Sequence, residues 1–189
     1  NLKGVSYIMA MFNRTSKNII LSGLFIAIGI ALPMMFHVLG LGSVFLPMHI
    51  PVLLSGFFVD IPYAFAVGAI TPMLSSMMTG MPPAFPVMPY MVFELAAYGG
   101  VVGITYKKGK LNPHLSLICS LITGRIVAGF AVWILATFFT AKLPGPVAFI
   151  LGAIAKGFPG IIIQLVFIPP TIILAKRYTQ AMEGNKIEL

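Results

Sequence analysis

The sequence predicts an all-α integral membrane protein whose six transmembrane helices form a single bundle. Of its 189 residues, 59% are hydrophobic and only 8% are charged, and the mean hydropathy is +1.01. A soluble domain of this size needs many more polar residues to cover its surface. The apolar residues gather in six runs, and most basic residues lie outside them. We expect one membrane domain over residues 1–189, with a short basic N-terminal segment (1–18) and a C-terminal tail (176–189) in the cytoplasm.

The six runs differ in length, and a helix needs about 20 apolar residues to cross a bilayer. They are Ile19–Phe36, Pro47–Val59, Pro62–Met78, Met88–Tyr106, His114–Thr140 and Val147–Ala175. The second and third runs are short and bounded by prolines, so we expect tilted, kinked or partly re-entrant helices there. The loop between the third and fourth runs, residues 79–89, carries four prolines and is expected to form a stiff outer lid.

The basic residues indicate how the helices are oriented. They gather before the first run, between the fourth and fifth runs, and after the sixth. With six spans, these three places lie on one side of the membrane. Because lysine and arginine favour the cytoplasmic side, we expect both termini and the loop KKGK (107–110) to lie in the cytoplasm. The net charge of +8 therefore indicates membrane topology and not nucleic-acid binding.

The sequence does not contain the residue patterns that catalysis needs. Its one cysteine, Cys119, allows neither an intrachain disulfide nor a thiolate metal cluster. There is no G-x-x-x-x-G-K-[ST] motif and therefore no P-loop, and no pairing of nucleophile and base emerges. His37 and His49 flank the first outer loop without a third metal ligand nearby, so we expect them to line its mouth and not to bind a metal. An enzyme is not expected.

Three ionisable residues lie inside the predicted helices: Glu94, Arg125 and Lys156. At 1.5 Å per residue, Arg125 lies roughly 16 Å from the cytoplasmic end of its run, whereas Lys156 and Glu94 lie roughly 14 Å and 8 Å from the outer face. An ionisable side chain at such depth is costly and indicates a functional site. Glu94 and Arg125 could simply join two helices as an ion pair. However, the two cations exceed the one acid, and a buried surplus charge predicts an anionic ligand.

Polar, aromatic and small residues recur around these three at a spacing of four, which places them on one helix face. The stripes are Tyr90, Glu94 and Tyr98; Arg125, Gly129 and Trp133; and Gly152, Lys156, Gly160 and Gln164. Glycines beside long polar side chains leave room either for a ligand or for close helix packing, and the spacing alone favours neither.

The first run carries a small-residue seam, Gly23, Ala27 and Ala31, at intervals of four. Such a seam lets another helix approach closely. That helix could belong to this chain or to a partner.

Taken in order, several stretches resemble the S components, the substrate-capture subunits of energy-coupling factor (ECF) vitamin transporters. The stretches are the A-x-x-x-A of Ala27 and Ala31, FLPMHIPVLLSGF, TPMLSSMMTGMPP and PYMVFELAAYG. The resemblance covers essentially the whole chain, and the last three stretches are its more specific part. The turn VDIPYA (59–64) departs from the glycine-containing turn of many relatives.

The resemblance implies a six-helix bundle in the bacterial plasma membrane that binds a vitamin or a vitamin precursor beneath its outer loops. It also implies partners, namely a transmembrane coupling subunit and two ATPases that hydrolyse ATP, so that this chain needs no cofactor. The S component of this family is thought to topple in the membrane while it carries its substrate inward. The seam of Gly23, Ala27 and Ala31 is then the docking surface for the coupling subunit.

Within this family, the surplus positive charge and the few aromatic residues favour pantothenate, a small and flexible hydroxylated acid whose carboxylate Arg125 could hold bidentately. The expected substrate-binding residues are Glu94, Arg125, Lys156, Tyr90, Tyr98, Trp133, Gln164 and His37. Cobalamin, folate, hydroxymethylpyrimidine and riboflavin are alternative substrates. A solitary secondary carrier that works without ATPases is the alternative to an ATP-driven importer.

Overall fold

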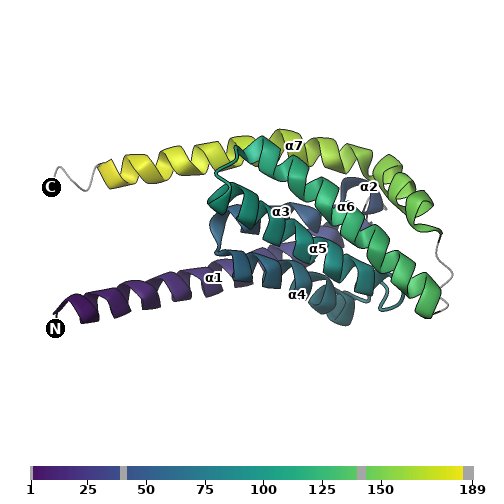
Figure 1. Cartoon of the computed structure of the whole chain (residues 1–189), viewed down its shortest axis with the longest axis horizontal. Helices are drawn as coiled ribbons and strands as arrows, with labels where there is room; N and C mark the ends of the chain where they lie inside the picture. The colour runs from purple at the N-terminus through teal and green to yellow at the C-terminus, as the bar shows by residue number, and fades with distance from the viewer. Residues whose placement is uncertain (1, 39–41, 140–143, 185–189) are drawn as a thin grey trace.

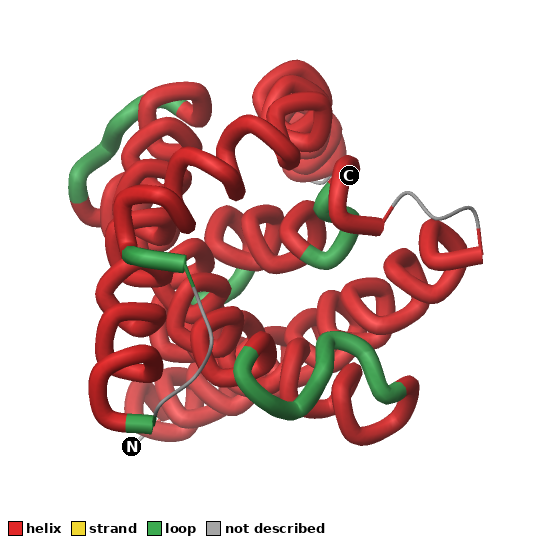
Figure 2. The backbone as a smooth tube through the Cα atoms, turned by 90° about the vertical axis from the view of Figure 1, so that its right-hand side faces the viewer, coloured by secondary structure: helices red, strands yellow, loops and turns green. Residues whose placement is uncertain are grey.

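The computed structural model describes residues 2–38, 42–139 and 144–184, and side chains within 13–36, 44–139 and 144–178. These residues form helices joined by loops, and no strand occurs in the described ranges (Figures 1 and 2). The helices are α1 (Leu2–Val38), α2 (Gly42–Phe45), α3 (His49–Phe58), α4 (Ile61–Thr79), α5 (Val87–Gly103), the π-helical turn η1 (Ile104–Lys108), α6 (Pro113–Phe138) and α7 (Pro146–Gly184). The predicted all-α fold class is confirmed.

Each of the six predicted runs is a helix, but they differ in whether they can cross a membrane alone. Five helices are long and apolar enough to do so: α1 from Asn13 to Phe36, α4, α5 with η1, α6, and α7 as far as Tyr178. The second run is only the 10-residue helix α3. At 1.5 Å per residue such a helix is about 15 Å long, which is half of a typical hydrocarbon core. The third run lies within α4, which at 19 residues is long enough for a span.

Helix α5 lies at the centre of the bundle and packs against α3, α4 and α6. The core is apolar and includes Val52, Val67, Leu95 and Val102, each with no exposed surface. At Gly68 of α4 the two helix backbones come so close that an added methyl group would meet the main chain of Leu95. This close approach lets α4 and α5 pack backbone to backbone at the centre of the bundle.

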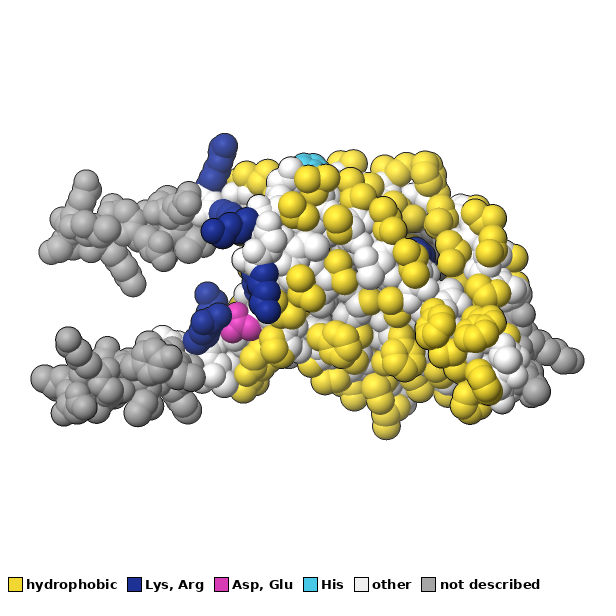
Figure 3. All heavy atoms as spheres, in the orientation of Figure 1, with side chains coloured by type: hydrophobic (Ala, Val, Ile, Leu, Met, Phe, Trp, Pro, Cys, Tyr) yellow, Lys and Arg dark blue, Asp and Glu magenta, His cyan; other side chains and the backbone are white. Residues whose placement is uncertain are grey.

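The outer surface of the bundle is covered by large apolar side chains over all its long helices (Figure 3). Exposed residues of this kind include Ile126 and Phe130 on α6 and Leu174 on α7. A surface of this composition is suited to lipid and not to water.

The start of α1 and the end of α7 project from the same end of the bundle, where basic side chains also gather (Figures 1 and 3). At this end Arg14 forms two hydrogen bonds with Asp60, at 2.9 and 2.8 Å, and Asn18 donates a third at 2.8 Å. The Arg14 guanidinium holds the pKa of the Asp60 carboxyl below its ordinary value. Lys107 donates to the carbonyl of Val59. These contacts join α1 to the turn between α3 and α4. That this end faces the cytoplasm stays a prediction.

Candidate binding site

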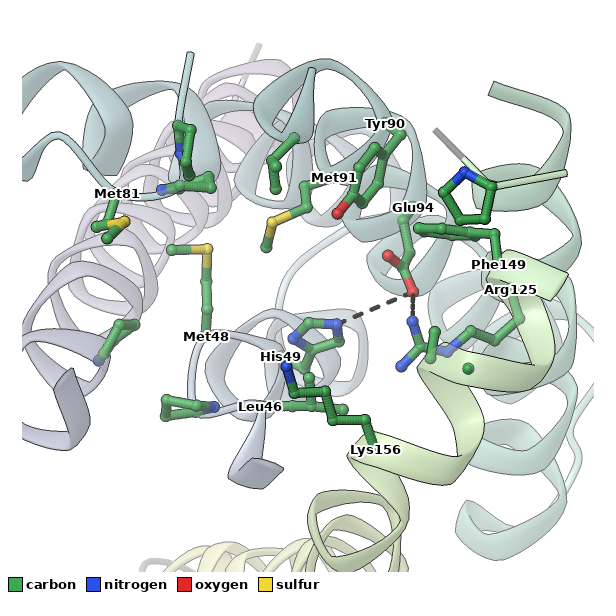
Figure 4. A pocket seen from close by; sticks show the side chains of 18 of the residues that line it. Leu46, Met48, His49, Met81, Tyr90, Met91, Glu94, Arg125, Phe149 and Lys156 are labelled. Carbon is green, nitrogen blue, oxygen red and sulfur yellow. Dashed lines mark hydrogen bonds and ion pairs between the residues drawn. The ribbon is translucent and has the colours of Figure 1, made fainter. Parts of the chain in front are cut away.

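A cavity of about 580 Å³, shown from close by in Figure 4, is lined by helix segments and loops remote from the basic end of the bundle. Its walls come from the last turn of the apolar part of α1, the start of α3, the loop after α4, the start of α5, the middle of α6 and the start of α7. The predicted lid loop contributes Met81, Pro82 and Pro83 to the wall. The cavity thus lies where chain segments far apart in the sequence converge, and its volume is in the range typical of small-molecule sites.

A buried ion pair forms one wall of the cavity. Arg125 on α6 donates from Nη1 to Oε1 of Glu94 on α5 at 2.5 Å, and Tyr98 donates its hydroxyl to the same oxygen at 2.7 Å. Glu94 is 2% exposed and Arg125 is 8% exposed. Because one carboxylate oxygen accepts both bonds, Glu94 is held firmly in place. The Nε atom of Arg125 has no hydrogen-bond partner among the described residues.

Lys156 on α7 enters the cavity from the opposite side, and its amine points toward the side where His49 lies (Figure 4). It forms no ion pair with any described side chain. Two cations, Arg125 and Lys156, therefore share the cavity with one carboxylate, Glu94, which leaves a surplus of one positive charge.

Apart from His49 and the hydroxyl of Tyr90, the rest of the wall is apolar and mostly aliphatic. Met48, Met81 and Met91 lie along one side of it (Figure 4). The aromatic residues are Tyr90 and Phe149, whose rings meet edge to face with centroids 4.9 Å apart. Methionine is flexible and polarisable, so this wall can adapt to a ligand of irregular shape.

Four of the eight predicted site residues line the cavity: Tyr90, Glu94, Arg125 and Lys156. Three others lie elsewhere. Tyr98 is fully buried behind Glu94, and Gln164 is fully buried without a partner for its amide among the described residues. Trp133 is 45% exposed on the outer surface, beside Phe130. His37 is in the last turn of α1, and its side chain lies outside the described residues.

The three displaced residues share one geometric cause. Tyr98, Trp133 and Gln164 each come eight residues after a residue that lines the cavity. With 3.6 residues per turn, eight residues add about 80° of rotation beyond two full turns, so the third residue of such a stripe has left the face of the first. Trp133 was expected to form a wall of the cavity, but it is not among the residues that line it.

The glycines in these stripes have different roles. Gly152 lines the cavity, and no atom lies within 4 Å of the position of an added methyl group. At Gly129 an added methyl would lie 2.6 Å from Ile150, and at Gly160 it would lie 2.6 Å from the carbonyl oxygen of Phe45. Gly152 therefore leaves open space, whereas Gly129 and Gly160 allow close packing.

From the sequence, His37 was expected at the substrate and His49 was not selected. His49, at the start of α3, lines it together with Met48. Phe149 at the start of α7 is a further wall residue that no motif indicated. The only sequence signal for His49 was its place beside the first outer loop, and His37 shares that place.

Comparison with known families tests the resemblance noted in the sequence. A family model described as "ECF transporter, substrate-specific component" matches residues 17–172. The chain belongs to this family. Searches of curated proteins and of solved structures find no match. As an ECF substrate-specific component, the protein is a multi-pass protein of the plasma membrane that binds a substrate for transport and is not an enzyme. Membership also implies that it works with the other subunits of an ECF module.

The ECF substrate-specific component presents the small-residue seam of α1 on its outer surface. Gly23, Ala27 and Ala31 are all exposed, and no atom lies within 4 Å of the position of an added methyl group at Gly23. Gly29 is instead the small residue that packs inward, where an added methyl would lie 2.6 Å from Thr71. No described helix of this chain covers the seam.

Proposed function

We propose that this ECF substrate-specific component captures a small carboxylate-bearing vitamin in the cavity, and that this vitamin is pantothenate. A transmembrane coupling subunit and two ATPases then use ATP to deliver it inward. In this proposal the basic end of the bundle faces the cytoplasm and the cavity opens to the outside, in accord with the preference of basic residues for the inner side.

The surplus charge of the cavity is the observation that carries the proposal. Glu94 already balances Arg125, whereas Lys156 has no acidic partner among the described side chains. Lys156 is exposed at the cavity, but it lies within the candidate membrane span of α7, where an ammonium without a counter-charge is costly. A ligand carboxylate would reduce this cost. Arg125 and Lys156 both line the cavity, and both side chains can donate to such a carboxylate. An anionic ligand therefore fits this cavity better than a neutral or cationic one.

The aliphatic wall favours pantothenate over vitamins that consist of flat rings. Sites for flat ligands typically offer aromatic faces for stacking. Here the two rings, Tyr90 and Phe149, meet edge to face, and the remaining uncharged wall is mostly aliphatic, with several methionines and prolines. Such a wall suits a branched aliphatic chain, as pantothenate has. Folate, riboflavin, cobalamin and hydroxymethylpyrimidine are the competing outcomes of the test.

The test is calorimetric titration of the purified protein with these five compounds. We expect pantothenate to bind most tightly and the Lys156→Met variant to bind it at least about tenfold more weakly, a loss of about 1.4 kcal/mol. Lys17→Met is the matched control, since Lys17 is exposed at the basic end, and it should leave binding unchanged. If only uncharged compounds bind, or if Lys156→Met binds pantothenate as tightly as the native protein, the proposed substrate class is wrong.

We also propose that the seam of Gly23, Ala27 and Ala31 docks on the coupling subunit, because it is smooth, exposed and not covered by any described helix of the chain. Ala27→Trp should abolish uptake in the assembled transporter and leave vitamin binding by the isolated chain unchanged. Ile126→Trp is a control on an exposed apolar position of α6. Loss of vitamin binding in Ala27→Trp would instead indicate that the seam packs within the protein.

A further inference from the structure

His49 has an unusual position among the polar residues of the cavity. Its side chain is 3% exposed, and neither ring nitrogen makes a hydrogen bond with any described residue. It nevertheless lines the cavity, and Figure 4 shows its ring directed into the space between Met48, Lys156 and Glu94. Buried polar atoms without partners are rare in native proteins, because each costs about 1–3 kcal/mol. A partner from outside the chain is therefore expected.

The neighbours of His49 do not supply that partner. Its Nε2 lies 4.0 Å from Oε1 of Glu94, too far for a hydrogen bond, and that oxygen already accepts from Arg125 and Tyr98. On its other side the ring of Tyr98 lies 5.3 Å away, centroid to centroid. The ring is thus fixed in orientation by packing, and both nitrogens are buried and unpartnered in a residue that lines the cavity.

The charges around His49 indicate which kind of group it can bind. A protonated ring would add a third cation to a cavity that already holds Arg125 and Lys156 against one carboxylate. We therefore take the imidazole as neutral, with one N–H donor and one acceptor. A hydroxyl group both donates and accepts, so it can pair with either nitrogen in either tautomer. A second carboxylate only accepts, and it would lie close to the negative charge of Glu94.

We propose that His49 binds a hydroxyl group of the ligand and makes the cavity specific for hydroxylated carboxylic acids. This inference rests on the proposed function, in which Arg125 and Lys156 hold the carboxylate of the same molecule. The two ends of the ligand are then recognised separately. Arg125 and Lys156 bind its carboxylate, and His49 at the start of α3 binds its hydroxyl group. The methionines between them contact the aliphatic part.

The experiment measures binding of two probes that differ only in their hydroxyl groups, one of which is assigned to His49. The first probe is pantothenate, and the second is N-(3,3-dimethylbutanoyl)-β-alanine, which keeps the carboxylate and lacks both hydroxyl groups. We expect the native protein to bind pantothenate at least about tenfold more tightly than the second probe, as the loss of buried hydrogen bonds predicts. His49→Phe should bind both probes within about twofold of each other, and its loss of affinity should be confined to pantothenate.

Further variants keep the result interpretable. His49→Leu replaces His49→Phe if the phenylalanine variant does not fold. His49→Gln restores a donor and an acceptor, and it should recover part of the preference for pantothenate. His114→Phe is the matched control, because His114 is exposed at the start of α6 and distant in the fold from the cavity lining; it should behave as the native protein.

Two results overturn the role of His49 while leaving the proposed function intact. One is a native protein that binds both probes equally well and still depends on Lys156. The other is an apolar His49 variant that keeps the native preference, which would mean that His49 contacts only water. If the native protein binds neither probe, the proposed function fails and the role of His49 fails with it.

Discussion

Substitution of Glu94 by glutamine tests whether the cavity is built around a charge surplus. Oε1 of Glu94 accepts hydrogen bonds from Arg125 at 2.5 Å and from Tyr98 at 2.7 Å, and the side chain is 2% exposed. Glutamine has nearly the same volume and keeps an oxygen acceptor, but it removes the negative charge. The charge of the cavity then rises from one positive charge to two.

The substitution should change stability and affinity in opposite directions. Arg125 would be left buried without a counter-charge, although it would still be hydrogen-bonded, so we expect the unliganded protein to lose about 1.5–3 kcal/mol. Full removal of one partner of a buried pair costs about 3–5 kcal/mol, and the retained amide keeps the loss below that. For the ligand, removing a negative charge about 6 Å away at an effective dielectric constant of about 20 favours a carboxylate by about 2–3 kcal/mol. Allowing for rearrangement of Arg125, we expect at least about tenfold tighter binding.

The assay is thermal unfolding in detergent with and without pantothenate, combined with calorimetric titration. Glu94→Gln should unfold at a lower temperature than the native protein when empty, and the vitamin should raise its unfolding temperature by a larger amount. Tyr98→Phe is the control: it removes a neutral donor to the same oxygen, so it should destabilise the protein by about 1 kcal/mol without a gain in affinity. Unchanged or weaker binding of pantothenate by Glu94→Gln would refute the charge argument, since Glu94 would then act as a ligand contact and not as a competitor.

Two further predictions concern the fold. Gly68→Ala should destabilise the protein by more than about 1–3 kcal/mol, because the new methyl meets the rigid backbone of Leu95. At Gly23 an added methyl has open space, so Gly23→Ala should stabilise the protein by about 0.5–1 kcal/mol. Equal unfolding temperatures for the two variants would contradict this packing. Arg14→Gln should lower the unfolding temperature only slightly at neutral pH, as expected for a largely exposed ion pair. Because Arg14 lowers the pKa of Asp60 from its ordinary value of 3.8, this difference should persist above about pH 4 and vanish as the pH falls through the lower pKa of the folded state. Unfolding curves measured across that pH range test it.

The fold was largely predictable because lipid imposes simple rules on a sequence. The apolar runs became helices. The second run, which is short and bounded by prolines, became the 10-residue helix α3. The ion pair between Glu94 and Arg125 was also predictable as one of two alternatives, since each is costly when unpaired in a membrane. Depth along a helix is a property of sequence position, so these residues could be placed at similar levels before the fold was known.

The detailed lining of the cavity could not be predicted in the same way. Which face a residue occupies depends on small angular offsets that accumulate along a helix, and Trp133 consequently points outward. The contribution of His49 and Phe149 depends on how the starts of α3 and α7 approach each other in three dimensions. No local pattern distinguishes His49 from His37, because both have apolar sequence neighbours and both flank the first predicted outer loop.

The balance of charge in the cavity also has an electrical consequence for transport. Counting Arg125, Lys156 and Glu94, the empty cavity is positive by one charge, and a bound monocarboxylate makes it neutral. Moving one elementary charge across the membrane potential gains or costs about 2.3 kcal/mol per 100 mV, depending on the direction. If the cavity moves across the bilayer, as the family resemblance implies, the loaded form does so without electrical work. The empty form is drawn toward the negative inner side, and its return must be driven against the field. The membrane voltage would thus act on the resetting of the protein and not on the entry of the vitamin.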